Sequence, residues 1–270
     1  MKIMQSLSLS ILGSSLLAFI AFPAGAATVF TDDFESYTPG TGNFTPAGTS
    51  WYDFYNAITV ADEASSTAFG SPNQFMILNV GSNFFRSDSL SQSASGLATY
   101  SFDFYDSSTA ASGPDGVRFG IGNGDLNSDK GYTGWFINDG VLSTAENTAL
   151  ASGTLPTLDE DKVYTAFVVY NGSASTQSIG GSGGSVAAGQ SALYFYDQAG
   201  STLLDAGRFS HTESVTPSGF LIRNFSSADT VLYVDNIAME DTLLVIPEPA
   251  SLVLVLLGTM VVGLGRLRRK

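Results

Sequence analysis

The chain has 270 residues, with 29 glycines, 12% aromatic residues, one histidine and no cysteine, a composition typical of short strands joined by many turns. Its 25 acidic residues against 11 basic ones give a formal net charge of −14, which argues against a nucleic-acid partner because such a surface repels phosphates. Without cysteine the chain has no disulfide, thiolate metal site or cysteine nucleophile, and the lone His211, interpreted as a solvated turn residue, leaves little for zinc or Ser-His chemistry.

The N-terminus, residues 1–27, has the pattern of a secretory signal peptide. Lys2 precedes an apolar stretch from Leu7 to Phe22, and small residues follow it. Signal peptidase requires small side chains at the first and third positions before the cut, so cleavage after Ala26 or Ala27 is expected. An uncleaved anchor is the alternative interpretation, and the short apolar core argues against it.

Residues 28–242 are expected to form one all-β ectodomain, an antiparallel β sandwich of the jelly-roll type. Tyr100, Phe102 and Phe104 alternate with more polar residues, which is the period-2 pattern of a strand with one wet face. No long stretch has a helical period, and antiparallel strands without helices must pack sheet on sheet. The predicted strands are Phe75–Val80, Ala98–Tyr105, Val117–Ile121, Gly134–Ile137, Val163–Tyr170, Ala192–Tyr196, Gly219–Arg223 and Thr230–Ala238.

Three polar segments are predicted to lie outside the strands. Gly172–Gly189 is rich in Gly, Ser and Ala and is predicted to be a flexible loop or an irregular insertion. Gly122–Asp129 is rich in oxygen ligands but lacks the spacing of an EF-hand, so it is interpreted as a turn. The consecutive acids of Asp159–Asp161 are interpreted as a solvated turn as well.

Two short acidic patterns lie at the ends of the ectodomain: Asp32–Tyr37, which reads DDFESY, and Leu232–Ile237, which reads LYVDNI. Together they resemble the first and last strands of concanavalin A-like jelly rolls and related carbohydrate-binding modules, where such strands lie side by side. In several such modules an early acid and the late Asp hold a structural calcium ion. The resemblance implies a site at Glu35 and Asp235, with Asp33 or a carbonyl beside them, since Ca²⁺ takes six to eight oxygen ligands. Solvated carboxylates on adjacent edge strands are the alternative.

Aromatic residues are candidates for a sugar platform. Trp51 and Trp135 are the most prominent, because flat exposed rings stack on the C–H groups of sugars. The same residues also dominate β cores, so a place in the core or at its rim is the competing interpretation.

The C-terminus carries Pro247, Glu248 and Pro249, then an apolar run over Ala250–Gly265, and then the basic residues Arg266, Arg268, Arg269 and Lys270. Such a run spans a membrane marginally, with the basic cluster in the cytoplasm. Triplet, helix and basic end resemble the PEP-CTERM sorting signal, here over residues 246–270. The resemblance implies recognition by an exosortase, a membrane-embedded cysteine transpeptidase-like enzyme of bacteria that make exopolysaccharide. An ordinary C-terminal anchor is the alternative.

The carboxylates give little sign of catalysis. Retaining glucanases of jelly-roll fold resemble one another in a Glu-x-Asp-x-Glu motif, which is absent here. Asp103 and Asp106 are an odd number of residues apart and are predicted to lie on opposite faces of their strand. The expected function is therefore a non-enzymatic cell-surface or extracellular-matrix protein, anchored transiently in the inner membrane and able to bind glycans such as exopolysaccharide. A secreted polysaccharide hydrolase or lyase is the alternative.

Overall fold

A computed structural model describes residues 28–40, 51–53, 58–62, 66–78, 83–86, 96–106, 117–122, 131–138, 140–144, 148–181, 183–211, 219–224, 232–241 and 245–246. All regular structure within these ranges is β-strand, and the paired strands are antiparallel except for one short parallel pair. No helix in the described part of the chain is long and apolar enough to cross a bilayer. The predicted signal peptide and sorting signal, including Pro247, Glu248 and Pro249 and the basic cluster of Arg266, Arg268, Arg269 and Lys270, lie outside the described residues.

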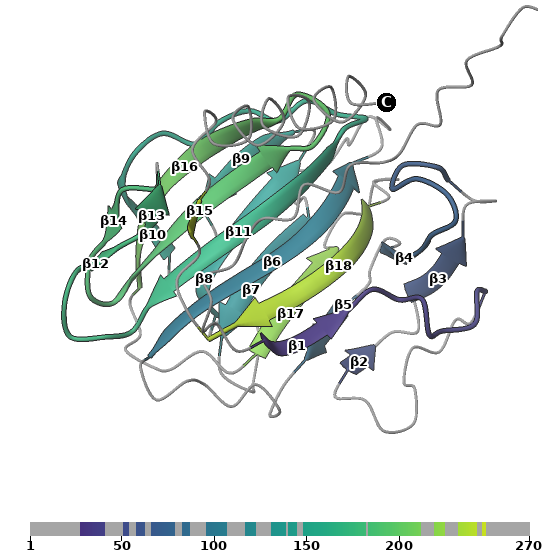
Figure 1. Ribbon diagram of the computed structural model, residues 1–270, viewed down its shortest axis with the longest axis horizontal. Helices are drawn as coiled ribbons and strands as arrows, with labels where there is room; N and C mark the ends of the chain where they lie inside the picture. The colour runs from purple at the N-terminus through teal and green to yellow at the C-terminus, as the bar shows by residue number, and fades with distance from the viewer. Residues whose placement is uncertain are drawn as a thin grey trace, which may run out of the picture.

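The strands form two large sheets that are layered face to face (Figure 1). The nine-stranded sheet has the order β10-β16-β15-β11-β6-β18-β4-β3, with β1 also paired to β18. Its strands are β1 (Thr28–Asp32), β3 (Ile58–Asp62), β4 (Gln74–Leu78), β6 (Leu97–Asp106), β10 (Thr148–Ser152), β11 (Val163–Asn171), β15 (Gln190–Asp197), β16 (Thr202–His211) and β18 (Leu232–Glu240). The six-stranded sheet, in the order β2-β5-β17-β7-β8-β9, comprises β2 (Trp51–Asp53), β5 (Asn83–Arg86), β7 (Val117–Gly122), β8 (Gly131–Asn138), β9 (Val141–Thr144) and β17 (Gly219–Asn224).

The main core lies between the two sheets and is dominated by aromatic rings. Phe102 from the nine-stranded sheet stacks on Phe119 at 4.8 Å between ring centroids, and Phe119 stacks on Trp135 at 5.5 Å. Phe102, Phe119 and Trp135 are each at most 1% exposed. Burial of apolar surface of this kind is the main favourable contribution to folding. The predicted antiparallel β sandwich is confirmed.

The two ends of the ectodomain meet on β18. β4 pairs with the first half of this strand and β1 pairs with the second half, while β6 lies along its other edge. The predicted neighbourhood of the first and last strands is therefore confirmed. The first strand, however, ends at Asp32, and the rest of the acidic pattern forms a turn, which corrects the prediction that Asp32–Tyr37 is itself the strand.

The segment Gly172–Gly189, of which residue 182 lies outside the described residues, is an insertion that we call the flap. It contains β12 (Gln177–Ser178), β13 (Gly180–Gly181) and β14 (Ser185–Val186), and β12 pairs with β14. A second apolar cluster, made of Phe167, Val169, Ile179, Val186, Ala192 and Tyr194, joins the flap to β11 and β15. The paired strands agree with the predicted insertion.

Candidate functional site

The candidate site lies on the outer face of the nine-stranded sheet, where β4, β18 and β6 are neighbours. Along β18, Leu232 and Val234 are buried in the main core, and Tyr233 and Asp235 alternate with them. Successive residues of a strand point to opposite faces, so Tyr233 and Asp235 belong to the face away from the core. The flap packs against β11 and β15 through the second apolar cluster. It lies at one end of the same sheet (Figure 1).

The turn after β1 brings Glu35 to the start of β4. Asp32 Oδ1 accepts a hydrogen bond from the Phe34 N–H at 3.0 Å, and Phe34 adopts a positive φ of 58° with its ring fully buried. A buried aromatic residue therefore fixes the turn. Glu35 Oε1 in turn accepts a hydrogen bond from the Gln74 N–H at 2.8 Å, which ties the acid to β4.

A bulge in β18 shapes the centre of the site. The register with β6 shifts between Asp235 and Ala238, and Asn236 within the bulge has a φ of 50°, a conformation that Asn tolerates better than most residues. The Asn236 carboxamide donates to Asp103 Oδ2 at 2.9 Å and to Asp235 Oδ2 at 3.2 Å. The bulge thus places one carboxamide between two acids on neighbouring strands.

Neighbouring acids disfavour the ionised form of Asp235. Asp235 is 1% exposed, and burial is the largest cause that raises its pKa to about 7. Hydrogen bonds from Asn73 and Asn236 lower this pKa, whereas the negative charges of Asp103 and Glu35 raise it further. Glu35 and Asp235, which were predicted together from the sequence, therefore lie within electrostatic reach of each other. The charged side chains that raise the pKa of Asp235 are thus both acidic.

The fit to a calcium ion is incomplete in this arrangement. Among the described residues, no three His, Cys, Asp or Glu side chains form a group that could hold a metal ion. Asp235 Oδ1 accepts the Asn236 N–H at 2.7 Å, and Oδ2 accepts the Asn73 Nδ2–H at 2.8 Å. Turning the Asn73 and Asn236 carboxamides would present oxygen instead of N–H, and together with Glu35 and Asp235 this would give four hard oxygen ligands of the kind that Ca²⁺ prefers.

A row of aromatic rings adjoins the acids. Tyr105 on β6 and Tyr233 on β18 are register partners and stack at 5.5 Å with an angle of 11° between their planes, and both are half-buried. The ring centroids of Phe75 and Tyr233 are 5.2 Å apart, and those of Phe69 and Phe75 are 5.5 Å apart. The Tyr105 hydroxyl donates to Asp161 Oδ1 at 2.9 Å, and burial together with this carboxylate raises the pKa of Tyr105 to about 12. The phenol therefore stays protonated at physiological pH.

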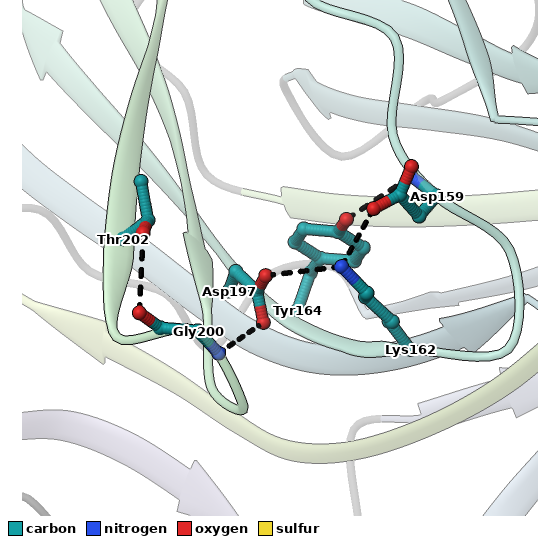
Figure 2. Close-up of polar contacts among 6 residues, drawn as sticks. All are labelled: Asp159, Lys162, Tyr164, Asp197, Gly200 and Thr202. Atoms are coloured by element: carbon teal, nitrogen blue, oxygen red, sulfur yellow. Dashed lines mark hydrogen bonds and ion pairs between the residues drawn. The ribbon is translucent and has the colours of Figure 1, made fainter.

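An ion-pair cluster holds the loop that carries Asp161 (Figure 2). Lys162 Nζ lies 2.6 Å from Asp159 Oδ2 and 3.4 Å from Asp197 Oδ2, so it joins this loop to the β15–β16 hairpin. Asp197 Oδ1 accepts the Gly200 N–H at 2.9 Å. That hydrogen bond is the largest cause that lowers the pKa of Asp197, and Lys162 lowers it further. The predicted turn at Asp159–Asp161 is confirmed, and it has a positioning role as well.

The other residues predicted from the sequence lie elsewhere. Trp135 is 1% exposed and packs in the main core, so its ring offers no surface to a sugar in this structure. Trp51 is described only as the first residue of β2. Asp106 is buried, whereas Asp103 lies in the outer network, as the odd spacing predicted. His211 is the last residue of β16 and not a turn residue.

Sequence reasoning missed Asn73, Tyr233, Asn236 and Asp161 as members of the site. Strand alternation could have indicated Tyr233, because it lies between the apolar Leu232 and Val234. Nothing in the sequence pattern indicates the bulge at Asn236 or the approach of Asn73, since both depend on how distant strands pair.

Comparisons with known proteins give similarities of backbone only. No family model matches the chain, and no curated protein matches it either. Among solved structures, the carbohydrate esterase of Shiga toxin-encoding bacteriophage phi24B is 12% identical, with 81% of this chain and 100% of that chain covered and a TM-score of 0.48. The endo-1,3-beta-glucanase of Streptomyces sioyaensis is 10% identical (82% and 98% covered, TM-score 0.47), and peanut lectin is 9% identical (80% and 97% covered, TM-score 0.45). With identities this low, the function must be argued from the residues of this chain.

Proposed function

We propose that this chain is an exported cell-surface or extracellular-matrix protein whose ectodomain binds glycans without altering them. The observation that carries the proposal is the half-exposed Tyr105–Tyr233 pair, with carboxylates and carboxamides directly beside it. Sugar recognition combines contact between C–H groups and aromatic rings with hydrogen bonds to hydroxyls. Both kinds of group are present on one face of the sheet.

The polar groups beside the tyrosines suit sugar hydroxyls. Asp161 and Gln198 are exposed at the same end of the sheet as Tyr105, and Asn236 is exposed in the β18 bulge. A carboxylate accepts hydrogen bonds only, whereas a carboxamide both donates and accepts. A hydroxyl does both as well, so these groups can pair with sugar hydroxyls, and Asn236 would accept through Oδ1 because its Nδ2 already donates to Asp103 and Asp235.

The acids Asp103 and Asp235 raise the alternative of a hydrolase, because hydrolytic sites also place two carboxylates side by side and raise the pKa of one. Two observations favour binding over catalysis. Asp235 is 1% exposed, so a glycosidic oxygen has no route to it in this conformation. Both of its oxygens are also engaged by N–H donors. A reducing-sugar assay on a panel of bacterial polysaccharides tests this point, and release of reducing ends would establish a hydrolase or a lyase in place of a binding protein.

Export and sorting rest on the sequence. Signal peptidase would remove residues 1–27, and the exosortase would act at Pro247, Glu248 and Pro249 while the apolar run holds the chain in the inner membrane. The two prolines would prevent the triplet from joining a helix over the apolar run and would keep it extended for an enzyme. The processed protein would then reside at the cell surface or in the matrix, where exopolysaccharide is the available glycan.

A structural calcium ion between Glu35 and Asp235 is also part of the proposal. The support is the buried acid, whose pKa is raised by the negative charges of Asp103 and Glu35. Calcium would neutralise this charge and join the turn after β1 to β18. It would thus act as a clamp between the two ends of a domain that has no disulfide.

A further inference from the structure

The last described strand, β19 (Val245–Ile246), lies against the flap and not against the strand that precedes it in sequence. It pairs in parallel with β13, with Gly180 opposite Val245 and Gly181 opposite Ile246. β18 ends at Glu240, so the chain leaves the nine-stranded sheet and reaches the flap within a few residues. Figure 1 places β13 beside β12 and β14 at one end of that sheet.

The sheet register explains why so short a connection suffices. Glu240 at the end of β18 is opposite Thr99 near the start of β6, and Leu97 at the start of β6 is opposite Asn171 at the end of β11. The flap begins directly after Asn171. Crossing from β18 to β11 covers two strand spacings, about 10 Å. The five chain steps from Glu240 to Val245 span up to roughly 17 Å when extended, so they reach the flap.

Hydrogen bonds from Arg208 and Tyr194 hold the flap in the position where it pairs with β19. Arg208 Nε donates to the Ser185 carbonyl at 2.7 Å and Nη2 donates to the Gly183 carbonyl at 2.8 Å, while the guanidinium lies over the Tyr194 ring. The Tyr194 hydroxyl donates to the same Gly183 carbonyl. Ile179 is buried beneath the flap at 1% exposure. These contacts fix the backbone on both sides of β13.

The residue types on the two strands suit strand addition. Gly180 and Gly181 have no side chain, so another backbone can approach them closely. Val245 and Ile246 are β-branched and favour extended backbone. The next residue is Pro247, which has no N–H and cannot donate to a further pairing bond, so the addition would stop there.

We propose that the flap is an acceptor for the chain's own C-terminal segment, and that docking of Val245–Ile246 on Gly180–Gly181 limits access to the peptide bonds that follow. Enzymes that cleave peptides commonly bind them as extended strands, which the flap prevents while it holds the same residues. Docking also fixes where the chain leaves the ectodomain. The docking rests on strand pairing alone, and only its effect on processing rests on the proposed sorting function.

A cysteine pair tests the docking in the full chain, purified in detergent. Gly180→Cys with Val245→Cys places thiols on register partners. Paired strands lie about 4.7–4.9 Å apart, which suits the Cα separation of about 4.4–6.8 Å that a disulfide needs. Because the native chain has no cysteine, mild oxidation is expected to give a monomer with an internal disulfide. The control, Ala188→Cys with Val245→Cys, uses an exposed flap position that is not a partner of β19 and should stay reduced. A disulfide-linked dimer would assign the acceptor to a second copy, and thiols that stay free in both variants would overturn the docking; either result contradicts the proposal.

Hydrogen exchange on the unmodified full chain is the second measurement, because it needs no substitution. At least one amide of Val245 or Ile246 should exchange tenfold or more slowly than in an unfolded chain, and exchange at the unfolded rate would overturn the docking. In cells with an exosortase, Gly181→Pro should speed removal of the C-terminus at least twofold, and unchanged removal would contradict the effect on access. If the disulfide forms but no variant is ever processed, the sorting proposal fails while the docking stands.

Discussion

Asp235 is placed where burial and two neighbouring acids oppose its ionisation. Its folded pKa, about 7, lies above the unfolded value near 4, so its contribution to stability is complete below about pH 4 and is lost as pH rises toward 7 and beyond. Without metal, the melting temperature should therefore fall over this range. Asp235→Asn should flatten the curve, because the carboxamide has the same shape and no charge. Exposed Glu160→Gln is the control, and a curve that Asp235→Asn leaves unchanged would contradict the assignment.

Calcium should offset the loss of stability that ionised Asp235 causes, if the proposed site exists. An ion that binds only the folded form adds about 2.7 kcal/mol when its free concentration is 100 times its dissociation constant, which raises the melting temperature by several degrees. Asp235→Ala should abolish the shift, and Glu35→Gln should weaken it. If EGTA leaves the melting temperature of the native protein unchanged and elemental analysis finds no calcium, the site does not exist.

Among the elements of the fold, the flap depends for its position on the guanidinium of Arg208. Arg208 donates to two flap carbonyls and lies 5.3 Å from the centre of the Tyr194 ring. Arg208→Met keeps much of the apolar stem but leaves the carbonyls without these donors, which should cost about 1–3 kcal/mol, mainly in the flap. The amide of Ile179, which donates to the Gly184 carbonyl, should then exchange faster with solvent.

The matched control for the flap is Lys162→Met, which removes a cation from the far end of β11 and should leave exchange in the flap unchanged. Exchange at Ile179 that stays slow in Arg208→Met would contradict the account, because the flap would then be held by its apolar contacts alone.

Much of the sandwich could be predicted from the sequence, because period-2 alternation is a local signal. Alternation in β6 indicated which residues face the core, and Tyr100, Phe102 and Phe104 are indeed buried. Two-residue strands such as β13 were not predictable, since their pairing is set by distant segments and not by composition. The glycine-rich flap lacks an apolar period of its own and gains order from Ile179 and Val186, which pack on the sheet.

The candidate site was only partly predictable, for a similar reason. The acids Glu35 and Asp235 were found through their patterns at the two ends of the ectodomain, and the fold brings them together. Asn73 and Asn236 were missed because a bulge and a turn place them, and neither feature has a distinctive sequence. Trp135 illustrates the opposite error, since residue type alone does not distinguish a core ring from a ligand platform.

For the whole molecule, the proposed export and sorting depend on the two ends of the chain. If the proposed sorting function is correct, replacing Arg268, Arg269 and Lys270 with uncharged residues should weaken membrane retention and C-terminal processing, because these charges would hold the end of the apolar run in the cytoplasm. Fractionation and immunoblotting of the C-terminal fragment measure this. Unchanged processing would show that orientation is set elsewhere in the chain.

Glycan binding at the outer face of the nine-stranded sheet is tested by titrating the protein with a polysaccharide selected on a glycan array. Tyr233→Ala removes one ring of the stacked pair and should weaken binding at least tenfold, which corresponds to about 1.4 kcal/mol. Leu150→Ala removes an exposed apolar side chain on the edge strand β10 and should leave affinity unchanged. The account predicts saturable binding that Tyr233→Ala alone impairs, with no reducing ends released. Binding that Tyr233→Ala leaves intact, or glycan cleavage by the native protein, would contradict it.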